Sequence, residues 1–166
     1  ELIEDKANRL FLVENPVEIK IEKAPKKKVE LHVHPDHPKR GKRILNIHEE
    51  IFIDEGDLNR MKEGKLHRLI DGFNFIKKGT KFIFDSEDYE NFKTSKNKGL
   101  IIHYLPKKKN MIAFELFKPD GKVSTGIAEE GVKDLKVGSI IQAERVGYCR
   151  LDSNDKNEYV FWFTHK

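Results

Sequence analysis

The stretch VEIKIEKAPKKKVELHVH, residues 17–34, indicates the fold class because apolar and polar residues alternate along it. Successive side chains of a β-strand point to opposite faces, so this pattern predicts two strands, each with one buried face. Lysines and a proline separate the two alternating segments and predict a connection between them. The apolar positions are Val17, Ile19 and Ile21 in the first segment and Val29, Leu31 and Val33 in the second.

Short apolar runs continue along the rest of the chain at spacings of roughly ten residues. Glycine, proline, aspartate and asparagine separate them, and helical periodicity is scarce. Regularly spaced strands with turn signals are typical of an all-β sandwich or barrel. The runs are EIFID (50–54), HRLID (67–71), FNFI (73–76), KFIFD (81–85), LIIHYL (100–105), MIAFELF (111–117), SIIQAERV (139–146) and EYVFWFTH (158–165).

Only two segments suggest helix. Residues 1–10, ELIEDKANRL, carry apolar residues loosely on one helical side, and residues 128–138, AEEGVKDLKVG, predict one short helical turn. The turn signal KPDGK at 118–122 separates two of the expected strands. The chain begins abruptly without Met or a helix cap, so we expect it to be a piece of a longer polypeptide.

Composition limits the protein to a few classes. A chain of 166 residues suits one compact domain or two small ones, and 37% hydrophobic residues provide a modest core. The single cysteine, Cys149, excludes an internal disulfide framework and fits a reducing cytosol, so we expect a cytoplasmic protein. No apolar run approaches the roughly 18 residues of a membrane span, and no signal peptide is apparent.

Positive charge is concentrated in four short segments of this mildly basic chain, whose net charge is +4 and pI about 9.0. A single lysine run is often only a solvated loop, but four in one small chain favour a polyanionic partner. The segments are KAPKKK (23–28), HPKRGKR (37–43), IKKGTK (76–81) and PKKKN (106–110).

The segment HVHPDH, residues 32–37, matches the zinc-binding pattern His-x-His-x-Asp-His of metallo-β-lactamase-type hydrolases. That class requires an α/β sandwich with further ligands from later loops, and the remaining histidines lie in or beside β runs without matching acidic partners. Pro35 and Pro38 also stiffen the loop as an extended connection. We therefore expect no catalytic metal site. We interpret His32 and His34 as solvated strand histidines, with adventitious metal binding at these two residues as the alternative.

Other catalytic patterns are weak or absent. KTSKN at 93–97 faintly resembles the Lys-Met-Ser-Lys-Ser loop of class I tRNA synthetases, but no His-Ile-Gly-His partner accompanies it. Nucleophile-elbow, phosphate-loop and dinucleotide glycine patterns do not occur. We expect no catalytic residues in this chain.

Several blocks, taken in order, resemble the C-terminal anticodon-binding domain of glutamyl-tRNA synthetases of the archaeal and eukaryotic type. The resemblance extends over residues 8–166, and an ordered series of blocks is more specific than any single motif. HVHPDHP is similar to a His-Pro-containing loop of that family, which makes the zinc pattern a coincidence of spacing. The blocks are NRLFLVENPVEIKIE, HPDHPKRGKR, EIFIDEGDL, GKLHRLIDG, KGLIIHYL, GIAEEGVKDLKVGSIIQAERVGYCRLD and VFWFTHK.

The resemblance implies a fold of two antiparallel β-barrels, related to the barrel of a ribosomal protein that binds 5S RNA. The proximal barrel is expected from residues 1–45 and 111–166, and the distal barrel from residues 46–110. This agrees with the all-β class that the alternating pattern predicts independently.

The resemblance also implies an anticodon-binding set. Arg9, Gln142 and Arg145 match residues that contact the middle anticodon base. The alternatives are that Arg9 is only a surface cation and that Gln142 forms hydrogen bonds within the barrel interior. Arg68 matches an arginine at the first base, and Asp36 stands where a glutaminyl relative has Asn beside the third. Strand alternation places Gln142 and Glu144 on one face, and Ile141, Ala143 and Arg145 on the other.

Two departures from the family pattern concern the third base. Asp36 is an anion, so it can accept from a base amino group but would repel a phosphate. The segment 58–64 is shorter than in glutaminyl enzymes, where it grips the second and third bases. Third-base selection must therefore differ, with Arg60, Lys62 and Lys65 as candidates.

The implied function is tRNA anticodon recognition within a glutamate–tRNA ligase. ATP and Mg²⁺ would serve the full-length enzyme, with none of them held by this chain. The implied partners are the N-terminal catalytic domain of the same polypeptide, tRNA(Glu), and tRNA(Gln) where no glutaminyl enzyme exists. The alternatives are the corresponding domain of a glutaminyl-tRNA synthetase and a stand-alone rRNA-binding β-barrel.

Overall fold

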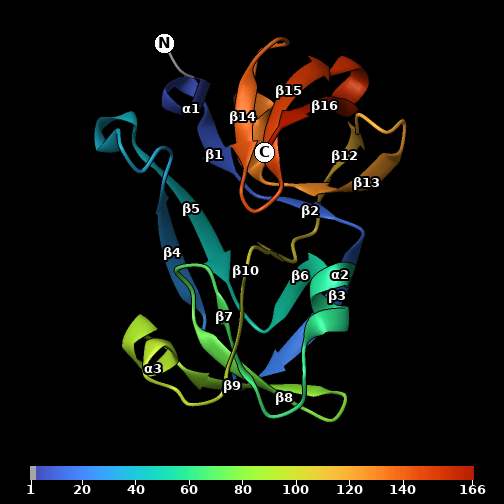
Figure 1. Cartoon of the computed structure of the whole chain (residues 1–166). Helices are drawn as coiled ribbons and strands as arrows, with labels where there is room; N and C mark the ends of the chain where they lie inside the picture. Colours follow the sequence, from blue (N-terminus) through green and yellow to red (C-terminus); the bar gives the residue numbers. More distant parts are fainter. Residues whose placement is uncertain (1–2) are drawn as a thin grey trace. The chain divides into compact units, whose positions relative to one another are not determined.

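The computed structural model describes residues 3–166, and β-strands dominate it (Figure 1). The helices are short: α1 (Ile3–Lys6), α2 (Glu55–Arg60), α3 (Tyr89–Lys93) and the 3₁₀ helices η1 (Pro38–Arg40), η2 (Glu130–Asp134) and η3 (Asp155–Asn157). The strands are β1 (Asn8–Leu10), β2 (Leu12–Glu14), β3 (Pro16–Glu22), β4 (Lys27–His32), β5 (Lys42–Ile47), β6 (Glu50–Asp54), β7 (Leu66–Leu69), β8 (Asn74–Lys78), β9 (Lys81–Ser86), β10 (Lys98–Ile102), β11 (Leu105–Pro106), β12 (Ile112–Phe117), β13 (Val123–Ala128), β14 (Ile140–Ala143), β15 (Gly147–Ser153) and β16 (Tyr159–His165).

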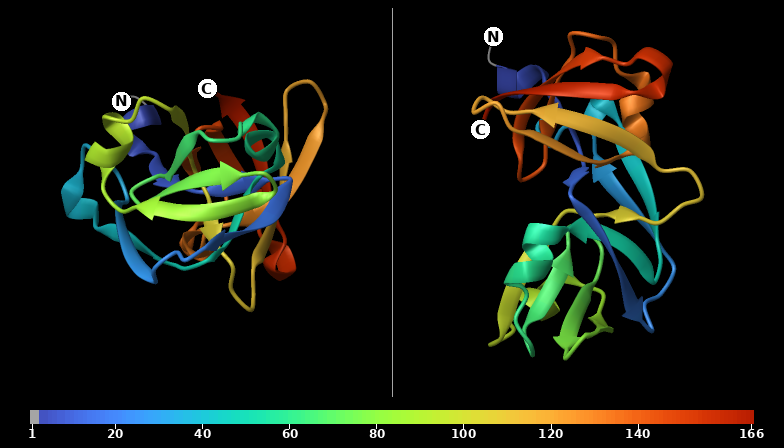
Figure 2. Two further views of the ribbon diagram at one scale, coloured as in Figure 1. Left: turned by 90° about the horizontal axis from the view of Figure 1, so that it is seen from below. Right: turned by 90° about the vertical axis from the view of Figure 1, so that its right-hand side faces the viewer.

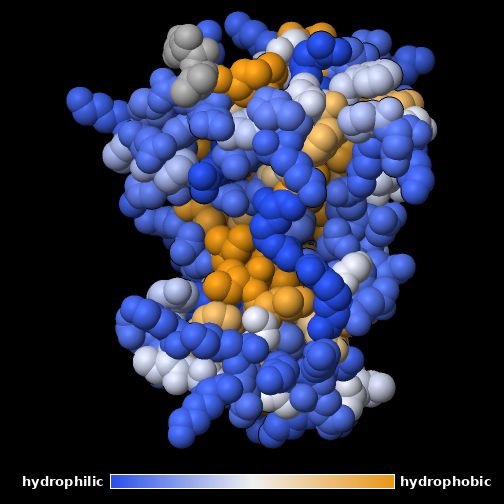
Figure 3. Space-filling view, viewed as in Figure 1, coloured by the Kyte–Doolittle hydropathy of each residue, from blue (hydrophilic) through white to orange (hydrophobic). Residues whose placement is uncertain are grey.

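The chain forms two compact units, each assembled from separate stretches of sequence. The first unit contains the chain up to Asn15, His32–Arg43 and Lys109–Lys166. The second unit contains Pro16–Leu31 and Ile44–Lys108. Hydrophilic residues cover most of the face in view, as the 36% of charged residues requires (Figure 3).

The first unit is a seven-stranded sheet in the order β1-β14-β15-β16-β12-β13-β2. Its two outer strands, β1 and β2, are consecutive in the chain and only Phe11 separates them. The edges of the sheet therefore meet at one corner, and the sheet curls into a nearly closed barrel. Figure 2 shows the β12–β13 hairpin of this sheet in yellow to orange.

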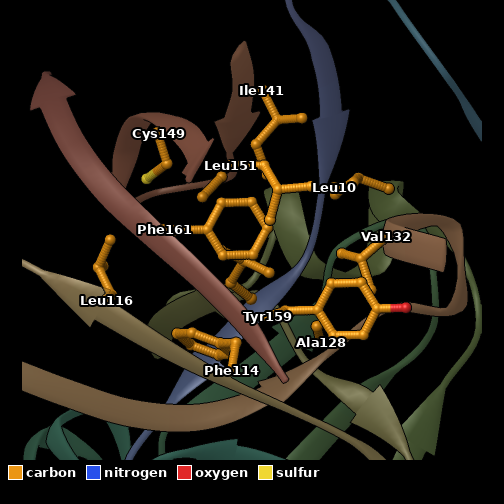
Figure 4. Close-up of a cluster of buried hydrophobic side chains, with 12 residues drawn as sticks. Leu10, Phe114, Leu116, Ala128, Val132, Ile141, Cys149, Leu151, Tyr159 and Phe161 are labelled. Carbon is orange, nitrogen blue, oxygen red and sulfur yellow. The ribbon is translucent and has the colours of Figure 1, made fainter. Parts of the chain in front are cut away.

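Alternation along these strands builds the core of the first unit. Phe161 lies among the apolar side chains that the surrounding strands contribute, with Leu10 and Leu151 close to it (Figure 4). Cys149 belongs to the same cluster, and burial raises the pKa of its thiol to about 12, which keeps it protonated. Each inward residue alternates with an outward one along a strand, so the residues that alternate with the core residues point to the outer face of the sheet.

A buried ion pair fills the corner between β1 and β2. The Glu129 carboxylate accepts from the Phe11 backbone N–H at 3.0 Å, and the Glu129 N–H donates to the Phe11 carbonyl at 3.1 Å. Arg43 donates to the same carboxylate from Nε at 2.9 Å, and its guanidinium lies 5.0 Å from the Phe11 ring centroid. The side chains of Arg43 and Glu129 are 7% and 4% exposed. The corner is thereby both hydrogen-bonded and charge-neutral.

The second unit has its own seven-stranded sheet, in the order β10-β7-β8-β9-β3-β6-β11. In β3 the inward side chains of Ile19 and Ile21 are buried and Glu18 and Lys20 are exposed, as the opening alternation predicts. Strands β4 and β5 pair separately as a two-stranded sheet. The expected all-β fold of two barrels is confirmed, with one difference: four strand pairs in the described residues are parallel (β1–β14, β12–β16, β3–β9 and β7–β10).

Helical expectations were only partly correct. The expected helix over residues 1–10 is restricted to Ile3–Lys6 in the described residues, and the chain is extended again from Asn8. The predicted turn near 128–138 is η2, whereas α2 and α3 were not anticipated. Both unanticipated helices begin after an aspartate whose side chain accepts from a backbone N–H of the first turn: Asp54 from Gly56, and Asp88 from Asn91. None of the helices in residues 3–166 is long and apolar enough to span a membrane.

His67 is a buried histidine of β7 in the second unit. Its Nδ1 accepts from the Leu100 N–H at 3.0 Å, and a Cβ at Gly99 would overlap its ring. Burial lowers the pKa of His67 to about 4; the Lys62 carbonyl opposes this shift and the charge of Lys77 adds to it. His67 is therefore neutral in the folded protein at pH 7.

We expect Glu129→Gln to destabilise the first unit by about 3 kcal/mol, because it leaves the buried Arg43 guanidinium without a counter-charge. The free energy of unfolding in urea measures this effect. Asp152→Asn is the control, since Asp152 and Arg150 form an exposed pair at 3.6 Å that should be worth less than about 0.5 kcal/mol. Equal losses in the two variants would contradict the structural role of the buried pair.

The His67 environment predicts an acid-sensitive stability. Its folded-state pKa lies below the unfolded value of 6.5, so the unfolded chain binds the proton first as the pH falls. The contribution of His67 to the free energy of unfolding is fully present above pH 6.5. It declines as the pH falls towards 4, by at most about 3 kcal/mol. Urea titrations across this range should show a shallower decline in His67→Gln than in wild type, whereas His32→Gln, which changes an exposed histidine, should follow wild type.

Candidate nucleic-acid interface

A row of four side-chain positions crosses four adjacent strands of the first unit. Arg9 of β1 is the register partner of Gln142 in β14, and Gln142 is the partner of Tyr148 in β15. Tyr148 is in turn the partner of His165 in β16. The neighbouring residues Ile141 and Cys149 belong to the core, so the row lies on the opposite, outward face of the sheet.

Arg9 is held at a defined position within this row. Its Nε donates to Gln142 Oε1 at 3.1 Å, and its Nη1 forms an ion pair with Glu144 Oε1 at 3.2 Å. Its backbone N–H donates to the Val33 carbonyl at 2.8 Å. The Arg9 side chain remains 34% exposed. Arg9 is therefore oriented by Gln142 and Glu144 while part of its guanidinium faces solvent.

The hydrogen bond between Arg9 and Gln142 determines which hydrogen-bonding groups the pair presents to a ligand. Because Gln142 Oε1 accepts from Arg9, the amide NH₂ of Gln142 is directed away from that contact. Guanidinium and amide N–H groups are both donors. The pair therefore offers donors to any ligand on this face, with Glu144 as the neighbouring acceptor.

Tyr148 and His165 continue the row as a stacked pair, and the sequence pattern did not identify them. Their ring centroids lie 4.7 Å apart with an interplanar angle of 19°. Thr164 Oγ1 donates to the Tyr148 carbonyl at 3.0 Å and lies 3.1 Å from His165 Nδ1. Burial raises the pKa of the Tyr148 hydroxyl; the charge of Glu4 raises it further and that of Arg9 lowers it. Tyr148 is thus within electrostatic reach of Arg9.

Arg145 does not lie on the strand face that alternation assigned to it. Strand β14 ends at Ala143, and Arg145 is an exposed residue of the following turn with φ of +66°. The Val146 N–H donates to the Ala143 carbonyl at 2.9 Å and closes this turn. A residue in the left-handed region cannot continue the two-residue alternation, which explains the wrong expectation.

Asp36 lies in the exposed loop that carries the histidine pattern. His34 is buried rather than solvated, which corrects its expected exposure; its Nδ1 accepts from the Asp36 N–H at 3.1 Å and its Nε2 lies 2.8 Å from the Glu4 carbonyl. His37 Nε2 contacts Asp5 Oδ1 at 2.6 Å. These histidines bind the N-terminal segment, while His32 is exposed as expected.

The loop has no metal-binding geometry. Within residues 3–166, no group of three or more His, Cys, Asp or Glu side chains is arranged to hold a metal ion. Strand β4 ends at His32, so His32 and His34 do not share a regular strand face. His34 and His37 are engaged by the Glu4 carbonyl and the Asp5 carboxylate instead.

Arg68 belongs to the second unit, whereas the other four candidate residues belong to the first. It is 7% exposed, and its Nη1 donates to Asn74 Oδ1 at 2.9 Å and to the Glu87 carbonyl at 3.0 Å. Burial lowers its pKa. Its guanidinium lies 5.7 Å from the ring centroid of Tyr89, which is 50% exposed. The surface at this position is therefore formed mainly by the tyrosine.

Some cations of the lysine segments have carboxylate partners. Lys107 contacts Glu18 at 2.5 Å and Glu50 at 3.5 Å, and the hydrogen bond to Glu18 raises its pKa. Arg60, a candidate for the third base, pairs with the buried Asp57 one helical turn earlier. Lys107 and Arg60 therefore carry less uncompensated charge than their sequence context suggests.

Comparison with known proteins places these features in a family. The family model described as "tRNA synthetases class I (E and Q), anti-codon binding domain" matches residues 7–95, and a second model with the same description matches residues 76–152. The glutamate–tRNA ligase of Methanocaldococcus jannaschii is 35% identical over 170 residues, which cover 100% of this chain and 30% of the relative. The enzyme of Methanobrevibacter smithii is 37% identical over 166 residues, covering 99% of this chain and 29% of the relative.

The chain spans about 30% of the length of these curated relatives. The glutamate–tRNA ligase of Pyrococcus furiosus shows the same relation, with 33% identity over 100% of this chain and 30% of the relative. The two family models together match residues 7–152, which include parts of both units, and the first alone matches more than half of the chain. This chain belongs to the anticodon-binding domain family of the class I tRNA synthetases for glutamate and glutamine.

Proposed function

We propose that this chain reads the anticodon of tRNA(Glu) as the C-terminal part of a glutamate–tRNA ligase, which joins glutamate to tRNA with ATP. The observation that carries the proposal is the outward row that begins with Arg9 and Gln142, in a chain with this family membership. Catalysis, with ATP and Mg²⁺, then belongs to the catalytic domain of the same polypeptide. The setting would be the cytoplasm, and tRNA(Gln) would be a second substrate where no glutaminyl enzyme exists.

The chemistry of the Arg9–Gln142 pair favours a particular base edge. Anticodon bases are single-stranded and can be splayed out, so a protein can hydrogen-bond to edges that a duplex would hide. A pair that presents donors suits a base with acceptors on its exposed edge, as in the carbonyl groups of uracil or the O6 and N7 atoms of guanine. We assign this pair to the middle anticodon base.

The other three candidates receive separate roles in the proposal. Arg145 is exposed on the turn after β14, so it can reach the same base or its phosphate. Asp36 is exposed and can accept from a base amino group beside the third position. Arg68 is assigned to the first base, together with the exposed ring of Tyr89 that its guanidinium faces. Stacking on an aromatic ring combined with a nearby guanidinium is a common way to hold a single-stranded base.

Arg9→Ala and Gln142→Ala should each cost roughly 1–3 kcal/mol in binding of cognate tRNA, the expected loss for a specific base contact. The loss should shrink when the middle anticodon base is already changed, because the contact is then absent. Fluorescence anisotropy of labelled tRNA with each protein and base change, alone and together, gives a double-mutant cycle for each residue.

Lys109→Ala is the matched control for the base-reading variants. Lys109 is exposed in the same lysine segment as Lys107, whose charge is engaged by two glutamates. Phosphate contacts carry no sequence information, so Lys109→Ala should weaken binding of every anticodon variant by a similar factor. Losses from Arg9→Ala that are equally uniform would assign Arg9 an electrostatic or structural role instead.

Binding should weaken steeply with salt, because lysine and arginine side chains replace counterions on RNA phosphates. Each neutralised phosphate of single-stranded RNA should add about 0.7 to the slope of log affinity against log salt concentration. Anisotropy titrations across a KCl series measure the slope, and Lys109→Ala should reduce it. A slope near zero would mean that the lysine segments only keep the protein soluble.

A further inference from the structure

A second row of side chains crosses the same sheet beside the first. Arg150 of β15 is the register partner of Trp162 in β16, and Trp162 is the partner of Phe117 in β12. Phe117 is in turn the partner of Val123 in β13. Three apolar side chains and one arginine therefore follow one another across four adjacent strands.

This row faces outward, and much of it is exposed. The alternate residues Leu116, Leu151 and Phe161 belong to the core, so their neighbours in the row point to the other face of the sheet. Trp162 is 43% exposed and Val123 is 45% exposed. Trp162 in β16 and Val123 in β13 flank Phe117 of β12, so the exposed apolar side chains follow one another across three neighbouring strands and are not scattered singly.

The two aromatic rings of the row are stacked on each other. The centroids of Phe117 and Trp162 lie 5.2 Å apart with an interplanar angle of 14°. A cross-strand aromatic pair stabilises a sheet by itself. That contribution accounts for the contact between the rings but not for the part of the indole that solvent reaches.

The second row adjoins the candidate base-reading row. Arg150 lies two residues after Tyr148 in β15, so both are on the outward face, and its register partner in β14 is Ile140, two residues before Gln142. Two residues along a strand span about 7 Å. A single strand of RNA that reaches Gln142 can therefore extend over the second row.

The composition of the row favours RNA over a protein partner. Arg150 is a half-exposed cation and the register partner of Trp162; its guanidinium contacts the exposed Asp152 at 3.6 Å, a solvent-screened pair that leaves it able to meet a phosphate or a stacked base. The apolar part consists of only three side chains, whereas protein-docking patches are larger and contiguous. Aromatic rings next to arginine on an exposed sheet face are a recurrent arrangement for unpaired bases.

We propose that Trp162, packed on Phe117, is a stacking site for one unpaired base of the RNA that Arg9 and Gln142 contact, with Arg150 holding that nucleotide. The site rests on the proposed function, because it requires that this chain binds RNA. Sequence preference at the site is weak, since every base offers a π-face for stacking.

The chain offers a direct measurement of this contact, because Trp162 is its single tryptophan. Titrating the 166-residue protein with unlabelled tRNA should quench the tryptophan fluorescence, and the quench should saturate with the same dissociation constant as anisotropy. Trp162→Ala should lower tRNA affinity by about tenfold to a hundredfold, the change that corresponds to the loss of one stacked base. Trp162→Phe should retain most of the affinity, because a phenyl ring still stacks.

Val137→Ala is the matched control, since Val137 is 57% exposed in the first unit but outside the row, and it should bind tRNA as wild type does. Circular dichroism spectra confirm that each variant is folded. Unchanged affinity in Trp162→Ala, or tRNA binding by wild type without a tryptophan quench, would overturn the stacking site and leave the proposed function intact. Failure of the wild-type chain to bind tRNA at all would instead overturn the proposed function.

Discussion

The first unit depends on the contacts that Glu129 makes with Phe11 and Arg43 at the corner between β1 and β2. Phe11 lies where the two outer strands of one sheet meet, so its backbone groups are not served by the ordinary strand ladder. Glu129 supplies both partners, accepting from the Phe11 N–H and donating its own N–H to the Phe11 carbonyl. Arg43 neutralises the carboxylate and covers the Phe11 ring. Without these contacts, closing the barrel would bury an unpaired amide and an unpaired charge.

Closure of this barrel also creates the candidate interface. Because β1 pairs with β14 at the edge of the sheet, Arg9 lies beside Gln142 although 133 residues separate them in the chain. The strand register then fixes which side chains follow, namely Tyr148 and His165. The positions of Arg9 and Gln142 are therefore set by the backbone hydrogen bonds of paired strands, whereas Asp36 and Arg145 lie outside the strands. Rigid elements hold a recognition site more accurately than loops do.

The loop at residues 34–40 shows how a motif can be correct in spacing and wrong in chemistry. His34 and His37 both use ring nitrogens to hold the segment before β1, at the Glu4 carbonyl and the Asp5 carboxylate. Arg40 adds hydrogen bonds to Asn8 and to the Lys6 carbonyl. Histidine suits this task because each ring offers two nitrogens that can serve as donor or acceptor. The same versatility makes a short histidine pattern a poor indicator of metal by itself.

The all-β class could be predicted without any tertiary information, because the two-residue alternation at residues 17–21 is a local property of each strand. The sequence also indicated the family, because the order of family-like sequence blocks can be recognised without knowledge of the fold. The family resemblance in turn identified Arg9 and Gln142 as candidates. Contacts between strands become visible in the folded chain alone: Tyr148 stacks on His165, and Arg145 lies on a turn. The physical reason is that register, burial and charge pairing arise between strands distant in the chain, and alternation within one strand carries no information about its partner.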